Sequence, residues 1–351
     1  MFPYYLLIGA SLAGAPLPLQ RSRFRWGYLL AMGLACWLLA SFRYVTGFDY
    51  RFYESAFQSI SASGLGGADW SEPGYLLLNW AVFLIGGDYR IFLLVFHFIL
   101  TALVFVWIGR YSPSPWMSVF LFLTLQYFAL SMNFLRQALA AAIVIWAYPF
   151  LKSRRFLPAC GIVLLAACFH RTALVMLPLC VLLTLPPTKR HYGLAAFATG
   201  AAYLLMDPLI DIAVAIAPKY QHYLTEKYWQ GNSFLYVLMP MGCLLFAIPL
   251  LRQATEEPDG SPVLVNSVFY SLLIQLFITR HFILERLSIY VAMFSLLALP
   301  AAVFAPCKRI SQKTRTGILI LGALAYFLFA VSQGFHGVYP YHGIWERALA
   351  P

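Results

Sequence analysis

Ionisable side chains interrupt the apolar stretches of this sequence at a few places, and these side chains are the first candidates for chemistry. Phe169-His170-Arg171 breaks the longest apolar run. Titratable groups are costly in such surroundings, so they are functional candidates by default. His170 can take part in proton transfer near neutral pH. A simple hairpin with its polar tip in water is the alternative interpretation.

A second polar segment, residues 43–88, mixes bases, carboxylates and many tyrosines. Asp49 lies in Gly47-Phe48-Asp49-Tyr50, and Glu72 lies in Glu72-Pro73-Gly74-Tyr75. Tyrosines at a membrane surface often form only an aromatic belt. Rings beside carboxylates also suit sugar binding, because rings stack on the C–H faces of sugars. A carboxylate near a hydroxyl can in addition act as a general base.

Arginine marks two more helix ends. In Asn133-Phe134-Leu135-Arg136-Gln137, Arg136 opens a strongly apolar helix, where its charge opposes the helix dipole. It can extend to the interface, or it can hold a phosphate in a bidentate grip. In the segment 280–286, His281 and Glu285 are four residues apart and share a helix face, which fits a salt-bridged turn as well as a site.

Two further polar groups are interpreted more simply. Asp207 and Asp211 share a helix face that is best explained as solvated. The tail Tyr339-Pro340-Tyr341-His342 either folds back over a site or extends freely. The sequence contains no phosphate-binding loop, nucleophile elbow or paired-histidine metal motif, so a metal or nucleotide site of the soluble type is not supported.

The elements that position these residues must be membrane helices. Hydrophobic residues make up 62% of the 351 residues and charged residues only 11%, against about 25% in soluble domains. The formal charge of +11 suggests a nucleic-acid partner at first. The bases lie between apolar runs and form no basic stripe, so nucleic acid is excluded and membrane loops are favoured.

We predict an all-α polytopic membrane protein with about twelve transmembrane helices, forming a single domain over residues 1–351. A re-entrant or interfacial segment is expected near 73–86, and the run 156–185 is split at His170-Arg171 because it is too long for one span. The expected outer loops are 43–88 and 207–232. The expected spans lie near 2–19, 26–42, 89–109, 115–131, 133–151, 156–169, 172–185, 190–206, 233–251, 263–279, 282–304 and 316–333.

The charges of the loops predict the orientation. Most Lys and Arg residues fall in the short loops on one side, for example Lys152, Arg154 and Arg155. The other side carries balanced acids and bases together with His and Tyr. Because positive loops face the cytoplasm, both termini and the polar candidates should face outward.

In this order, the polar motifs resemble one family, the EpsG/Wzy-type polysaccharide polymerases of bacterial inner membranes. The resemblance covers about residues 1–341 and is best over 40–180. It rests on the following motifs: Arg43 with Gly47-x-Asp49-Tyr50 and Tyr53; Glu72-Pro73-Gly74-Tyr75 with Asn79; Arg136-Gln137; Phe169-His170-x-x-Ala173 with Leu177-Pro178; Glu285-Arg286; and Tyr339-Pro340-Tyr341.

The resemblance implies a reaction at the outer face of the membrane. Oligosaccharide repeat units carried on undecaprenyl diphosphate are joined into exopolysaccharide, capsule or O-antigen, and the lipid diphosphate leaves. Arginine is needed to stabilise the departing diphosphate, and a carboxylate or histidine to accept the acceptor's proton. The implied catalytic residues are Asp49, Glu72 and His170. The implied substrate-binding residues are Arg43, Tyr50, Tyr53, Tyr75, Asn79, Arg136, Gln137, Arg280, Glu285, Arg286 and Tyr339.

The same resemblance implies the surroundings of the protein. The expected location is the bacterial inner membrane, with lipid-linked oligosaccharide and membrane lipids as ligands. A chain-length regulator and a flippase of the same pathway are expected partners. We expect no cofactor and no metal held by the protein, whereas a divalent cation bridging the diphosphate is left open.

Two alternatives remain at this point. A flippase or transporter for the lipid-linked oligosaccharide would share the spans and the inner charges, but should show inverted repeats and broken helices in corresponding halves. A membrane O-acyltransferase acting on the polysaccharide would need a buried histidine, and His170 could serve.

Overall fold

The computed structural model describes residues 1–351 except 68–71, 217–232, 257–260, 282–283 and 350–351. The described residues are helices and connections, with one isolated β-bridge between Arg43 and Gly343. The predicted all-helical fold is therefore confirmed for this part of the chain. Long apolar helices form because each satisfies its own backbone hydrogen bonds without water.

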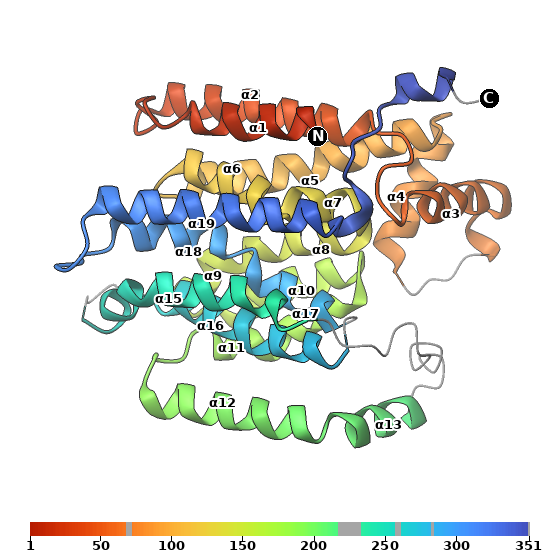
Figure 1. The fold of residues 1–351 in the computed structure, drawn as a ribbon. Coiled ribbons are helices and arrows are strands. Elements are labelled where there is room, and N and C mark those ends of the chain that lie inside the picture. Colours follow the sequence, from red (N-terminus) through yellow and green to blue (C-terminus); the bar gives the residue numbers. More distant parts are fainter. Residues whose placement is uncertain (68–71, 217–232, 257–260, 282–283, 350–351) are drawn as a thin grey trace. The chain divides into compact units, whose positions relative to one another are not determined.

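The helices fall into two compact units, which are described separately (Figure 1). The first unit comprises Met1–Ala147, Cys160–Leu174 and Lys308–Pro351. The second unit comprises Tyr148–Ala159 and Val175–Cys307.

The first unit is built around α5, whose aromatic side chains fill its centre. Phe92, Phe96 and Trp107 of α5 are fully buried, as are Phe120 and Phe122 of α6. Helix α2 packs along α5, and α1 packs along α6. The helices of this unit are α1 (Phe2–Leu12), α2 (Ser22–Ser41), α3 (Tyr50–Ser63), α4 (Pro73–Leu84), α5 (Tyr89–Tyr111), α6 (Pro115–Thr124), α7 (Tyr127–Asn133), α8 (Leu135–Val144), α19 (Gln312–Ser332) and most of α10 (Phe156–Ala167).

The second unit has a core of small and β-branched residues, which let α15, α16 and α18 approach closely. Asn266 of α16 donates to the carbonyl oxygens of Leu183 and Leu185 and accepts from Tyr192, so it joins α11, α12 and α16. The helices of this unit are α9 (Tyr148–Lys152), α11 (Met176–Leu182), α12 (Lys189–Leu204), α13 (Met206–Ile216), α15 (Leu235–Glu256), α16 (Val263–Gln275), α17 (Glu285–Ala292) and α18 (Ser295–Phe304).

The described residues contain fewer candidate membrane spans than the sequence suggests. Four described helices are long and apolar enough to cross a membrane alone, namely α2, α5, α15 and α19. Three bent pairs, α6–α7, α12–α13 and α17–α18, raise the number to seven if each pair is one span. The predicted count of about twelve is not confirmed, because several apolar runs form helices of only 10–17 residues.

Two predictions about interruptions can be compared with the helix ends. The apolar run 156–185 is broken as predicted, because α10 ends at Ala167 and α11 begins only at Met176, after a 3-10 turn at Arg171–Val175. The segment near 73–86 forms the 12-residue helix α4, and whether it re-enters the membrane stays a prediction. Most of the expected outer loop 207–232 lies outside the described residues.

The C-terminal tail, residues 335–346, folds back onto the start of the polar segment 43–88. The amide of Tyr44 donates to the His342 carbonyl, and the amide of Gly47 donates to the Gly337 carbonyl. Thr46 Oγ1 accepts from the His342 amide at 3.1 Å. The tail therefore holds residues 42–49, from which α3 begins.

Candidate active site

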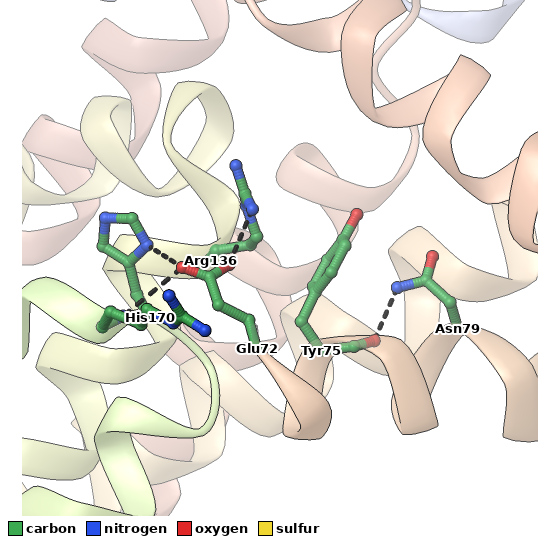
Figure 2. A network of polar contacts seen from close by, with 6 residues as sticks. Glu72, Tyr75, Asn79, Arg136 and His170 are labelled. Atoms are coloured by element: carbon green, nitrogen blue, oxygen red, sulfur yellow. Dashed lines mark hydrogen bonds and ion pairs between the residues drawn. The ribbon is translucent and has the colours of Figure 1, made fainter. Parts of the chain in front are cut away.

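Three side chains from separate parts of the first unit meet at the start of α4 (Figure 2). Glu72 accepts from Arg136 Nη1 through Oε2 at 2.6 Å and contacts His170 Nδ1 through Oε1 at 2.7 Å. The backbone amide of Arg171 also donates to Oε1, at 3.3 Å. The Glu72 side chain is about one-tenth exposed, and Arg136 is the most open of the three. We call Glu72, Arg136 and His170 the ion cluster.

The sequence Glu72-Pro73-Gly74 explains why Glu72 stands there. Proline favours the first position of a helix, so α4 begins directly after Glu72. The Gly74 amide donates to the Cys168 carbonyl at 2.8 Å. A Cβ at Gly74 would lie 3.0 Å from the Phe169 ring and 3.1 Å from the Cys168 carbonyl oxygen. Glycine thus lets the start of α4 dock against the residues just before His170.

The bond to Glu72 sets the tautomer of His170. An ionised carboxylate only accepts hydrogen bonds, so Nδ1 must carry the proton. In neutral His170 the other ring nitrogen, Nε2, then holds a lone pair, and it receives no hydrogen bond from the described residues. Figure 2 shows this nitrogen on the side of the ring away from Glu72. The arrangement matches the way a carboxylate orients a catalytic histidine.

Glu72 itself is held ionised. Burial alone would raise the pKa of its carboxyl, but the hydrogen bond with His170 and the charge of Arg136 outweigh burial and hold the pKa below its ordinary value of 4.5. A carboxylate that is held ionised by two partners is a weak base near neutral pH. The Nε2 lone pair of His170 is therefore the candidate acceptor of a proton in the cluster.

Three aromatic rings lie close to the guanidinium of Arg136. Its guanidinium carbon lies 5.8 Å from the ring centre of Phe52, 5.9 Å from Tyr53 and 5.6 Å from Tyr75. Its Nε is buried and has no hydrogen-bond partner among the described residues. Such rings hold a guanidinium in place by cation–π attraction, and its N–H groups can still donate to an anion that enters the site.

Asp49 is connected to the same region through the backbone. Its amide donates to Asn133 Oδ1 at 2.9 Å, three residues before Arg136. Gly47 adopts φ +101°, and a Cβ there would lie 2.9 Å from the Met132 carbonyl oxygen. The loop before α3 can pass this close to the end of α7 only because residue 47 is glycine.

Arg43 is buried to 1% exposure, away from solvent. Its Nη1 donates to the Ala40 carbonyl and to His97 Nε2, each at 2.5 Å. Its guanidinium also lies 5.8 Å from the ring centre of Tyr50. In this arrangement Arg43 fixes the end of α2 against α5 and does not reach an open surface.

The other predicted residues of the first unit are mostly buried supports. Asn79 donates to the Tyr75 carbonyl at 2.7 Å, one helical turn earlier (Figure 2). Gln137 is 3% exposed, next to Arg136. Tyr339 is half-buried; it donates to Gln126 Oε1 at 2.8 Å and packs edge-on against Tyr4, so the tail holds it against α1.

The remaining predicted residues belong to the second unit. Arg280 donates to Asp207 Oδ2 and to the Tyr203 carbonyl, and His281 lies 3.6 Å from Asp207. Glu285 and Arg286 begin α17 and are half-buried.

Three residues that take part in these contacts were not among the candidates predicted from the sequence. Asp207, interpreted as solvated, pairs with Arg280. His97 lies in the middle of the most apolar span, and an ionisable residue there should have been a candidate. The role of Arg171 rests on its backbone amide, which no pattern of side chains reveals.

Comparison with known proteins agrees with these features. The family model described as the EpsG family matches residues 26–342. The chain is 26% identical over 314 residues to the EPS I polysaccharide export inner membrane protein EpsF of Ralstonia nicotianae, covering 83% of this chain and 72% of that protein. No solved structure matches the chain. The chain thus belongs to the EpsG family, as a membrane protein with a role in exopolysaccharide biosynthesis.

Proposed function

We propose that this protein polymerises oligosaccharide repeat units carried on a lipid diphosphate, by glycosyl transfer at the outer face of the bacterial inner membrane. The ion cluster is the observation that carries the proposal. It joins a guanidinium suited to a diphosphate and a histidine suited to a hydroxyl through one carboxylate. Membership of the EpsG family supports the same polymerase activity.

In the proposed reaction, His170 Nε2 removes the proton of the acceptor hydroxyl. The acceptor oxygen forms a bond to the anomeric carbon of the donor glycan, and the bond from that carbon to the diphosphate oxygen breaks. The diphosphate leaves with the electron pair, and Arg136 stabilises the negative charge that develops on it. The proton remains on His170 and is later released to water.

Glu72 acts in this scheme as a positioning residue. It fixes the ring of His170, stabilises the imidazolium formed in the reaction and holds Arg136 through its other oxygen. Asp49 stays the second candidate for the base, because its position at the start of α3 ties it to the segment that carries Arg136.

Tyr53 and Tyr75 flank Arg136 and are buried, so they would hold its guanidinium in place. Arg43, Asn79 and Gln137 would act by holding these elements in place, because all three are buried. Arg280, Glu285 and Arg286 are proposed as contacts of the second unit with the substrate. A divalent cation, a chain-length regulator and a flippase remain proposed partners on the ground of family membership.

The test is chain growth by the purified protein in vesicles supplied with lipid-linked repeat units, with products resolved by size. Wild type should yield a ladder of products, and Arg136→Ala and His170→Ala should yield the single unit only. Lys152→Ala, at the end of α9, is the matched control for loss of a cation and should keep the ladder. Undiminished ladders from both site variants would refute the proposed reaction.

Export of the lipid-linked unit is a second candidate, favoured by the printed name of the Ralstonia relative. The two functions differ in what an inactive variant leaves at the cell surface. A failed polymerase still displays single repeat units, whereas a failed exporter displays none. The size distribution of surface glycan in an Arg136→Ala strain therefore separates them.

A further inference from the structure

A polar groove of about 530 Å³ lies in the first unit, apart from the ion cluster. One wall is a single face of α3, and the other is the turn that joins α4 to α5. The α3 wall includes Glu54, Gln58 and Ser61, which recur every three or four residues and so share one helix face. Tyr44, Tyr50 and Tyr89 line it together.

The opposite wall is shaped by a glycine pair. Gly86 has φ +78°, and a Cβ at Gly87 would lie 2.7 Å from Val82 Cγ1 and 2.8 Å from its carbonyl oxygen. The tight turn brings Asp88 to the groove at the start of α5. Asp88 Oδ1 accepts from the amides of Arg90 and Ile91, and its Oδ2 has no hydrogen-bond partner among the described residues. An exposed acceptor oxygen is therefore left at the groove.

The charges of the lining select the class of ligand. Among the described lining residues, the carboxylates of Glu54 and Asp88 outnumber the one guanidinium, that of Arg90. Glu54 is also paired with Arg51, whose Nη1 lies 2.7 Å from its Oε2, so positive and negative charges balance and the groove gives an anion no net attraction. Tyrosine rings with carboxylate, amide and hydroxyl groups instead offer apolar faces beside hydrogen-bonding groups, and neutral sugars present both.

Helix α3 contacts the ion cluster and also lines the groove. Phe52 and Tyr53 of this helix lie beneath Arg136, while Glu54, Gln58 and Ser61 face the groove. We propose that the groove is a second saccharide-binding subsite, which holds neutral sugar residues of the glycan beyond the unit that reacts. The proposal rests on the proposed function for the origin of the glycan.

The proposal is tested by placing a large side chain on the face of α3 that lines the groove and, as a control, on a face that does not. Ser61 lines the groove, whereas Ser59 is exposed and does not line it. Ser61→Trp should block the groove, and Ser59→Trp is its matched control on the same helix. The probe is a fluorescently labelled oligosaccharide of about six to ten sugars, cut from the host's own exopolysaccharide and carrying no lipid.

Binding of this probe to the full-length protein in detergent should weaken at least tenfold in Ser61→Trp, a loss of about 1.4 kcal/mol. In Ser59→Trp it should stay at the wild-type level. Gln58→Ala, which removes an amide without adding bulk, should weaken binding in the same direction and covers the case in which Ser61→Trp misfolds. In vesicles, Ser61→Trp should shorten the polymer but still join the first two units.

Two results separate this proposal from the proposed reaction. If Arg136→Ala loses chain growth but binds the probe normally, both the reaction and the separate subsite are supported. If the wild type binds the probe but shows no chain growth, and Ser61→Trp does not bind the probe, the subsite is supported and the polymerase reaction is contradicted. Equal probe binding in wild type, Ser61→Trp and Gln58→Ala would overturn the subsite.

Discussion

One carboxylate oxygen of Glu72 binds the guanidinium of Arg136, and the other binds the imidazole of His170. Removal of the Glu72 charge affects both partners at once. Arg136 would lose its anchor, and His170 would lose the acceptor that defines its tautomer. Effects on such coupled residues are not additive, so the carboxylate should matter more than either bond alone suggests.

Glu72→Gln should lower the rate of chain growth by about 10³–10⁴-fold, since a glutamine amide can donate to His170 Nδ1 and reverse its tautomer. The rate is measured on lipid-linked repeat units in vesicles. Glu346→Gln is the control, because Glu346 forms a similar pair with His342 at 2.6 Å on the exposed part of the tail. A rate within a few-fold of wild type for Glu72→Gln would exclude the orienting role.

The lowered pKa of Glu72 also predicts a dependence of stability on pH. A carboxyl whose pKa is lower in the folded than in the unfolded state stabilises the fold above its ordinary value of 4.5. That contribution is lost as the pH falls through the lower, folded-state pKa. Thermal unfolding in detergent at pH 7 and at successively lower pH below 4.5 should therefore show a smaller acid-induced loss for Glu72→Gln than for wild type. Equal losses would contradict the ion pairing.

At the scale of the element, the site depends on how the start of α4 and the loop before α3 are held. Helix α4 docks through Gly74 onto the residues before His170. The loop 42–49 is held by the C-terminal tail and passes the end of α7 at Gly47. Neither contact involves a side chain of the ion cluster, yet both hold the elements that carry Glu72 and Tyr53.

Gly74→Val should separate the start of α4 from the Cys168–His170 segment, at a cost of about 1–3 kcal/mol from overpacking. Chain growth should fall, and His170 should become easier to modify with diethyl pyrocarbonate. Gly27→Val in α2 is the matched control, because a Cβ at Gly27 would meet nothing within 4 Å. The same histidine reactivity in both variants would show that the docking does not position the site.

Thr46→Val should loosen the tail, because the buried Thr46 hydroxyl accepts from the His342 amide and donates to the His342 carbonyl. Valine leaves that partly buried amide without its partner, which costs about 1 kcal/mol. Thermal unfolding and limited proteolysis of the tail measure the effect. Thr316→Val serves as the control, since the Thr316 hydroxyl bonds back to Gln312 within its own helix. A tail that resists protease equally in both variants would refute this role of Thr46.

At the scale of the whole molecule, the loop charges predict which side of the membrane each end of a helix meets. In a background without the native cysteines, a cysteine at Ser63, near the end of α3, should react with a membrane-impermeant reagent in intact spheroplasts. A cysteine at Ser153, beside Arg154 and Arg155, should react only after the membrane is opened. If both cysteines were labelled from outside, the ion cluster and the basic loops would lie on one side of the membrane, which would contradict the proposed topology.

The class of the protein and most of the candidate residues of the site can be predicted from the amino-acid sequence alone. The apolar runs require membrane helices, because a helix forms all of its backbone hydrogen bonds within itself and needs no water in the lipid. The polar interruptions at Glu72, Arg136 and His170 stood out because charges are costly in such surroundings. The break at His170-Arg171 followed from length alone, and the helix ends at Ala167 and Met176 confirm it.

Tertiary structure decided which candidates meet. Glu72 is 64 residues from Arg136 and 98 from His170, and no local pattern encodes pairing over such distances. The buried pair of Arg43 and His97, and the pair of Asp207 and Arg280, were hidden for the same reason. Hydropathy measures only the length of an apolar run. The bends that join or divide short helices arise from packing, so the number of candidate spans could not be predicted from the sequence.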